Sequence, residues 1–189
     1  MSMSIQEINT FKSFASDRVA VVMALQIESE KLLEKSGFNI FYTGVGLINA
    51  SISLTKFIER MRPDRVVNLG TAGSIDYPIG SLVEVSSVMQ RHPVFAHLNK
   101  ELKLNSITKL PQVVCGSADY IETLSRDKHN LFNIVDMECY ALAKVCQSYK
   151  IPLHSIKYIT DLSNQNVDTE WKSNLNNARL KFTELLNQF

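Results

Sequence analysis

Continuous apolar runs alternate along the chain with segments in which apolar residues recur every three or four positions. Residues 19–25 (VAVVMAL) form the longest wholly apolar run, which is typical of a strand buried on both faces. Residues 49–61 and 137–149 show the spacing of helices with one packed face. Strands that alternate with helices in this way predict a three-layer α/β fold with a mostly parallel central sheet.

The remaining elements follow from the same patterns and from glycine and proline positions. Helices are also expected at residues 26–33 and 168–189, and strands at residues 37–43, 65–69, 81–86, 112–115, up to 135, and 153–159. Compact turns are expected at residues 44–46, 70–74, 76–80 and 116–121, whereas residues 90–110 give no clean period and predict a loop or small helix. Residues 1–17 are expected to form an amphipathic extension, and residues 18–189 a single domain.

Composition narrows the class of partner. The 189 residues carry a net charge of only +1, so electrostatics give no reason to expect nucleic acid or an acidic membrane surface. The apolar runs are too short to span a bilayer, and the first 18 residues lack the apolar core of a signal peptide. We therefore expect a cytoplasmic protein whose partner is small and neutral.

The cysteines and histidines do not show the spacing of metal ligands. Cys115, Cys139 and Cys146 are odd in number and widely separated, which argues against a disulfide framework and against a zinc ribbon. Cys139 and Cys146 share one helix face, where cysteine is more often a small buried apolar group. We predict reduced thiols and no metal.

Polar elements follow one expected strand after another. They are Glu28, residues 44–46, residues 70–73, residues 117–121, residues 136–138 and residues 160–161. Any one of these acids has an ordinary explanation; Asp136 and Glu138 could simply complement a helix dipole, worth about 0.3–1 kcal/mol. The whole series at strand ends, where open α/β sheets bind ligands, instead predicts a functional site.

The ordered segments that carry this series resemble the purine nucleoside phosphorylase family, and within it the 5'-methylthioadenosine/S-adenosylhomocysteine nucleosidases. They are MALQIE (23–28), GVGLINA (44–50), NLGTAG (68–73), SADYI (117–121), VDME (135–138) and ITD (159–161). The resemblance spans residue 18 to the C-terminus. It implies a twisted central sheet, cleavage of a purine N-ribosidic bond without a cofactor, and a homodimer whose partner subunit completes the site.

The resemblance also implies roles for single residues. Asp161 would donate a proton to purine N7, Glu28 would activate water, and Glu138 would hold the ribose hydroxyls. Met137 and Tyr120 would pack on the nucleoside, and the backbone of Ile121 would read the adenine edge. The other expected substrate-binding residues are Gly46, Thr71, Ala72, Gly73 and Thr160. The motif around Tyr120 is one residue shorter than is usual in the family.

Water is a better nucleophile than phosphate for this chain. Family phosphorylases carry an arginine just before the central glycines, where this chain has Asn68 and Leu69, and Glu28 would repel phosphate. The chain also departs from typical nucleosidases, because the hairpin before Gly44 and the segment 90–110 are short. The alternatives are a phosphorylase, a catalytically silent nucleoside-binding protein, and a nucleosidase for another 6-amino- or 6-oxopurine nucleoside.

Overall fold

The computed structural model describes residues 18–30, 32–33, 37–38, 40–91, 101–121 and 131–187. The extension predicted for residues 1–17 lies outside the described residues, as does the middle of the segment 90–110. The elements in chain order are β1 (Val19–Met23), α2 (Gln26–Ser29), β2 (Ile40–Tyr42), α3 (Leu47–Met61), β3 (Arg65–Ser74), β4 (Leu82–Gln90), β5 (Leu102–Lys103), β6 (Gln112–Ser117), β7 (Ile134–Asp136), α4 (Cys139–Tyr149), β8 (Leu153–Asp161) and α5 (Val167–Leu186).

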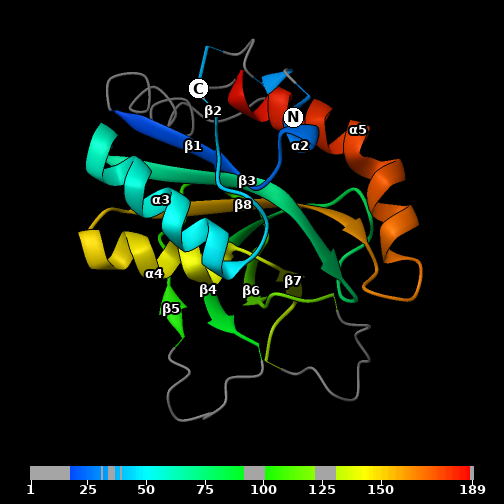
Figure 1. The fold of residues 1–189 in the computed structure, drawn as a ribbon. Coiled ribbons are helices and arrows are strands. Elements are labelled where there is room, and N and C mark those ends of the chain that lie inside the picture. The colour runs from blue at the N-terminus through cyan, green and yellow to red at the C-terminus, as the bar shows by residue number, and fades with distance from the viewer. Residues whose placement is uncertain are drawn as a thin grey trace.

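The strands in the described part of the chain form one sheet that partly closes on itself (Figure 1). β1 pairs in parallel with β2 and β3, and β3 pairs in parallel with β8. β8 pairs antiparallel with β4, which runs parallel to β6, and β6 runs parallel to β7. β7 returns to pair antiparallel with the end of β3. The strands β3, β8, β4, β6 and β7 therefore form a ring in a mostly parallel sheet.

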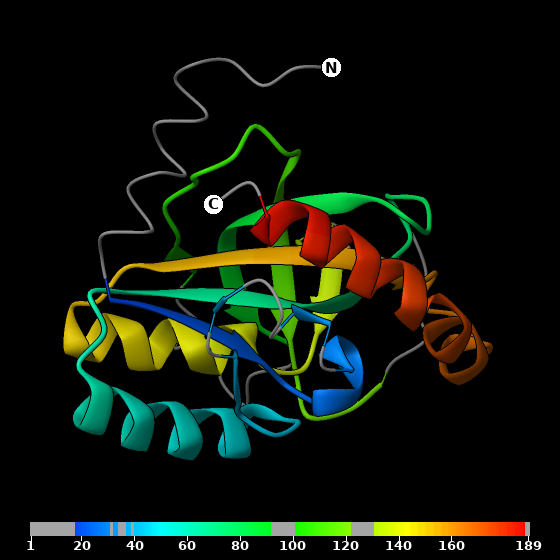
Figure 2. The same ribbon diagram turned by 90° about the horizontal axis from the view of Figure 1, so that it is seen from above.

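Helices cover the sheet on two sides, which confirms the predicted three layers. α3 and α4 lie along one face and α5 along the other (Figure 2). Along β1, Ala20 and Val22 belong to the core under α3 and α4, whereas Val21 and Met23 belong to the core under α5. Successive side chains of a strand point to opposite faces, so a strand between two cores must be apolar throughout.

The turn predicted at residues 70–74 is wrong, because β3 continues through Ser74. Its register with β8 shifts between Ala72 and Gly73, and Gly73 pairs both with Asp161 of β8 and with Val135 of β7. An ideal Cβ on Gly73 would lie 2.5 Å from Asp161 Oδ1 and closer still to Ser163 Oγ. Gly73 therefore allows the end of β8 to lie close to β3, and the chain does not change direction here. β6 likewise extends through Ser117, into the turn predicted at residues 116–121.

Two predicted helices differ at their ends. The helix expected at residues 26–33 is described only as α2, which ends at Ser29 because Glu30 adopts a left-handed conformation with φ 46°. α4 begins at Cys139 rather than Met137, and Glu138 is its N-cap residue. No helix among the described residues is long and apolar enough to cross a bilayer.

Candidate active site

A cavity of about 260 Å³ lies where β1, β3, β7 and β8 end. Its wall includes every residue that the sequence predicted for the site except Gly46: Glu28, Thr71, Ala72, Gly73, Tyr120, Ile121, Met137, Glu138, Thr160 and Asp161. Gly46 contacts the site indirectly, through its backbone. Residues as far apart as 28 and 161 therefore meet at one place, as the series of strand ends predicted.

Glu28 follows the end of β1 and is held as a hydrogen-bond acceptor. Its Oε2 accepts the Leu25 N–H at 3.0 Å, and its Oε1 accepts the N–H and the hydroxyl of Thr71 at 3.2 and 3.0 Å. The Trp171 indole donates to Thr71 Oγ1 at 3.0 Å, and because an indole only donates, the Thr71 hydroxyl is directed to Glu28. Glu28 is buried, yet a carboxylate with about four acceptor positions keeps one for a ligand.

Glu138 lies at the start of α4 and lines the same cavity. Its Oε1 accepts the Gly46 N–H at 2.9 Å, which joins the loop before α3 to the site. Gly46 has φ 92°, a conformation that favours glycine. Burial, together with repulsion from Asp136 and Glu28, raises the pKa of Glu138 to about 8, against the opposing effects of Lys157 and the Gly46 N–H. The carboxyl group is therefore largely protonated at neutral pH when the cavity holds no ligand.

Asp161 is the last residue of β8 and is also buried. Its Oδ2 accepts the Thr160 hydroxyl at 2.9 Å, and its Oδ1 accepts the Ser163 N–H at 3.0 Å. Burial raises the pKa of Asp161, although these two hydrogen bonds act in the opposite direction. The direction of this shift agrees with the need of a proton donor to stay protonated near neutral pH.

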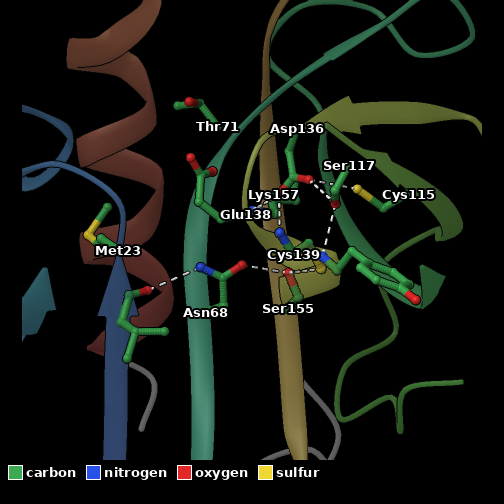
Figure 3. A network of polar contacts seen from close by, with 12 residues as sticks. Met23, Asn68, Thr71, Cys115, Ser117, Asp136, Glu138, Cys139, Ser155 and Lys157 are labelled. Carbon is green, nitrogen blue, oxygen red and sulfur yellow. Dashed lines mark hydrogen bonds and ion pairs between the residues drawn. The ribbon is translucent and has the colours of Figure 1, made fainter. Parts of the chain in front are cut away.

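Asp136 is separated from Glu138 by one residue but belongs to a different, buried network (Figure 3). Its Oδ2 lies 2.8 Å from Lys157 Nζ and accepts the Cys139 N–H at 3.0 Å, while its Oδ1 accepts the Ser117 hydroxyl at 2.5 Å. Burial alone would raise the pKa of Asp136, but attraction to Lys157 and these hydrogen bonds outweigh it and lower the pKa. Glu138 occupies the N-cap position of α4, but the Asp136 carboxylate accepts the N–H at the start of the helix, so Asp136 has a structural role.

Asn68 belongs to the same buried network, because the Cys139 thiol contacts the Ser155 hydroxyl at 3.5 Å (Figure 3). Its amide donates to the Val22 carbonyl at 3.3 Å, and its oxygen accepts the Ser155 hydroxyl at 2.8 Å. These contacts connect β1, β3 and β8. The position where phosphorylases of the family carry an arginine is thus structural in this chain.

A possible metal-ligand cluster occurs next to the same network. Among the described residues, ligand atoms of Cys115, Asp136 and Cys139 lie within 4.8 Å of one another. The Lys157 ammonium already supplies a positive charge at 2.8 Å from the Asp136 carboxylate. Burial also raises the pKa of the Cys115 thiol well above its ordinary value, which opposes the thiolate that a metal needs. All three cysteines are buried and free.

Arg91, Ser163 and Trp171 also line the cavity, although sequence reasoning did not assign them to it. Arg91 directly follows β4 and donates to the Tyr120 carbonyl at 2.9 Å, with its guanidinium 5.1 Å from the centre of the Tyr120 ring. Tyr120 and Ile121 are themselves partly exposed at the rim. Both Ser163 and Arg91 could have been predicted from their positions in the sequence. Ser163 follows Asp161 by two residues, and Arg91 lies at another strand end.

Comparison with known proteins shows which family the chain resembles. A family model described as the phosphorylase superfamily matches residues 110–189. The 5'-methylthioadenosine/S-adenosylhomocysteine nucleosidase of Staphylococcus epidermidis is 25% identical over 175 residues, covering 75% of this chain and 76% of the relative.

Solved structures share the fold. A nucleosidase of the same kind from Colwellia psychrerythraea, in complex with adenine, has a TM-score of 0.79 at 19% identity, covering 91% of this chain and 94% of its own. A futalosine hydrolase mutant of Helicobacter pylori has a TM-score of 0.78 at 16% identity, covering 91% and 98%. These comparisons confirm the resemblance of the chain to the phosphorylase superfamily and, within it, to the 5'-methylthioadenosine/S-adenosylhomocysteine nucleosidases.

Proposed function

We propose that the protein is a purine nucleosidase that hydrolyses the N-ribosidic bond of an adenine nucleoside such as 5'-methylthioadenosine or S-adenosylhomocysteine. One observation carries the proposal. Four buried acids line one small cavity: Asp136 is paired with Lys157, whereas Glu28, Glu138 and Asp161 differ in their hydrogen-bond partners. Relatives that match over three quarters of the chain carry the name of this nucleosidase, which supports the substrate class.

The reaction breaks the bond between ribose C1' and purine N9 and forms a bond from water oxygen to C1'. Negative charge develops on the purine and positive charge on the sugar, as in other glycoside hydrolyses. Asp161, whose pKa is raised, gives its proton to N7 so that the base leaves neutral. A general acid in the correct place contributes about 10²–10⁴ in rate.

Glu28 takes the proton of the attacking water. Three donors fix its carboxylate, which leaves its remaining acceptor position on Oε2 for the water. Glu138 holds the ribose hydroxyls from the other side of the cavity, with the Gly46 N–H fixing one of its oxygens. Met137 and the Tyr120 ring pack against the nucleoside, and Ile121 offers backbone groups at the rim.

Phosphate is a poor co-substrate for this cavity. Phosphorolysis requires cationic groups around the anion, and the Asn68 side chain is committed to Val22 and Ser155. The Arg91 guanidinium does line the cavity, but it bonds to and stacks on Tyr120. A catalytically silent binding protein is also disfavoured, because mere binding gives no reason to hold Glu28 in position for water.

The test is to incubate the purified protein with 5'-methylthioadenosine, S-adenosylhomocysteine, adenosine and inosine, and to follow release of the free base. Each incubation is run with and without inorganic phosphate. Hydrolysis predicts release that does not depend on phosphate. Release only in the presence of phosphate would establish a phosphorylase instead, and tight binding without release would establish a silent binder.

We further propose that the protein acts as a homodimer. Four exposed apolar residues lie on α3 and on the loop after β6, and we call them the rim patch: Ile48, Ile52, Tyr120 and Ile121. The Leu47 N–H donates to Asp119 Oδ1 at 2.5 Å, which brings the start of α3 next to the loop that carries Tyr120 and Ile121. Exposed apolar side chains on neighbouring segments are typical of a protein–protein interface.

A further inference from the structure

Ser163 has a strained backbone at the cavity wall. Four described non-glycine residues have positive φ, and three of them, Glu30, Arg62 and Lys150, are C-cap residues of helices. Ser163, with φ 51°, caps no helix and instead follows Asp161 by two residues. Strained residues of this kind persist mainly where surrounding structure enforces them, often at ligand sites.

The turn places the Ser163 hydroxyl beside the acid. The Ser163 N–H donates to Asp161 Oδ1 at 3.0 Å, and the hydroxyl lies over Gly73. An ideal Cβ on Gly73 would collide with both Ser163 Oγ and Asp161 Oδ1, so the two oxygens approach the same point of β3. Only glycine at position 73 leaves room for both oxygens.

The hydroxyl has no hydrogen-bond partner among the described residues, although Ser163 is only 1% exposed. Most buried hydroxyl groups form a hydrogen bond, so a buried hydroxyl without one in a cavity wall requires an explanation. A serine side chain moves between staggered positions about χ1, which carries its oxygen from Gly73 toward the cavity. A ligand that enters the cavity can therefore supply the missing partner.

The chemistry of purines identifies that partner. N7 and the substituent at C6 lie next to each other on the same edge of the ring, where adenine presents an amino donor and guanine a carbonyl acceptor. A group beside the acid that protonates N7 therefore faces the 6-position. A serine hydroxyl both donates and accepts, so it pairs with either substituent.

We propose that Ser163 Oγ contacts the 6-substituent of the purine and allows the cavity to accept both 6-amino- and 6-oxopurine nucleosides. The inference rests on the proposed function, because it uses the placement of N7 at Asp161. It makes Ser163 a specificity-determining residue.

The experiment compares wild type with Ser163→Ala on three 5'-methylthio nucleosides that share one sugar and carry an amino group, an oxo group or hydrogen at C6. Loss of one hydrogen bond should lower kcat/KM about tenfold for the amino and oxo compounds and leave the 6-hydrogen compound unchanged. Ser148→Ala is the matched control, because its hydroxyl is exposed and bonds only to the Val145 carbonyl of its own helix.

An equal fall for all three compounds would mean that Ser163 acts through Asp161, and no change would mean that it makes no contact; either result overturns the proposal. Binding of adenine, hypoxanthine and unsubstituted purine to both proteins is measured by calorimetry in parallel. If wild type cleaves no nucleoside, the proposed function fails, while a Ser163→Ala loss of affinity for adenine and hypoxanthine alone would still support the contact. Equal binding by both proteins, or no binding, overturns it.

Discussion

At the scale of single residues, the acids at the cavity differ in their hydrogen-bond partners. Glu28 accepts three hydrogen bonds, Asp161 accepts two, and the only contact described for the Glu138 carboxyl is the Gly46 N–H. Asp136 is fully committed to Lys157 and to the start of α4. Glu28 is therefore suited to water activation, Asp161 to proton donation and Glu138 to ribose binding, whereas Asp136 supports the structure.

Asp161→Asn should lower kcat by about 10²–10⁴, because the amide fills the same space but cannot give a proton to N7. Steady-state base release from 5'-methylthioadenosine measures the loss, and thermal unfolding shows that the variant still folds. Asp76→Asn, at an exposed acid outside the cavity, serves as the control. Undiminished turnover in the Asp161 variant would remove this acid from the mechanism.

The raised pKa of Glu138 predicts how stability depends on pH. The folded protein keeps a proton on Glu138 up to a pKa of about 8, whereas the unfolded chain releases it near 4.5. Between these values the native state binds more protons, so the free energy of unfolding falls as pH rises, by at most about 1.4 kcal/mol per pH unit. Above pH 8 this contribution levels off.

Glu138→Gln tests this dependence, because its oxygen can still accept the Gly46 N–H but it does not titrate. Urea unfolding at several pH values from 5 to 9 should show a smaller decline for the variant than for wild type. Comparing the two proteins removes the contribution of Asp161, which they share. Parallel curves would contradict a raised pKa at Glu138.

At the scale of elements, β8 and its partners connect the two sides of the cavity. β8 carries Lys157 into the ring and ends at Asp161, while β7 brings Asp136 and leads directly to Glu138. The Asp136–Lys157 ion pair therefore fixes the strand end from which Glu138 projects. Both side chains are 1% exposed, so neither charge has water to compensate for a lost partner.

Lys157→Met should destabilise the fold by about 3–5 kcal/mol, since it leaves the Asp136 carboxylate buried without its cation. Asp136→Asn should also be costly, and the double variant should lose less than the sum of the single losses, because the two groups interact directly. Denaturant unfolding measures all three. Strict additivity would show that the two charges do not stabilise each other.

The elements also show which features a sequence pattern can and cannot predict. The 19–25 run and the 49–61 periodicity predicted β1 and α3 because burial on two faces or on one leaves a repeating signal. The second half of β3 was predicted to be a turn because of its glycines. Gly73 instead leaves room for Ser163 and Asp161, which are nearly ninety residues away in the sequence. Local pattern does not record such distant contacts.

At the scale of the whole molecule, closure of the strands into a ring brings the residues of the site together. β7 meets the end of β3 through Gly73 and Val135, and this pairing brings Glu138 and Asp161 to one cavity. The family motifs predicted which residues meet there. They did not predict that Lys157 neutralises Asp136 or that Arg91 holds Tyr120, because these partners lie in segments without a motif.

The rim patch predicts the oligomeric state. Replacing both Ile48 and Ile52 with glutamate should convert a dimer to a monomer, because the charges would be buried against apolar surface in the interface. Sedimentation velocity measures the change. Lys56→Glu, at another exposed position of α3, is the control. Wild-type protein that sediments as a monomer at micromolar concentration would refute the proposed homodimer.

Trp171 gives the molecule a built-in optical reporter. The chain contains one tryptophan, and its indole lines the cavity and donates to Thr71, which in turn donates to Glu28. All intrinsic tryptophan emission therefore originates at the site, and an unmodified sample should show a change in intensity when adenine or a nucleoside enters. Stopped-flow fluorescence could then separate ligand entry from bond cleavage without a label, and Trp171→Phe should abolish the signal.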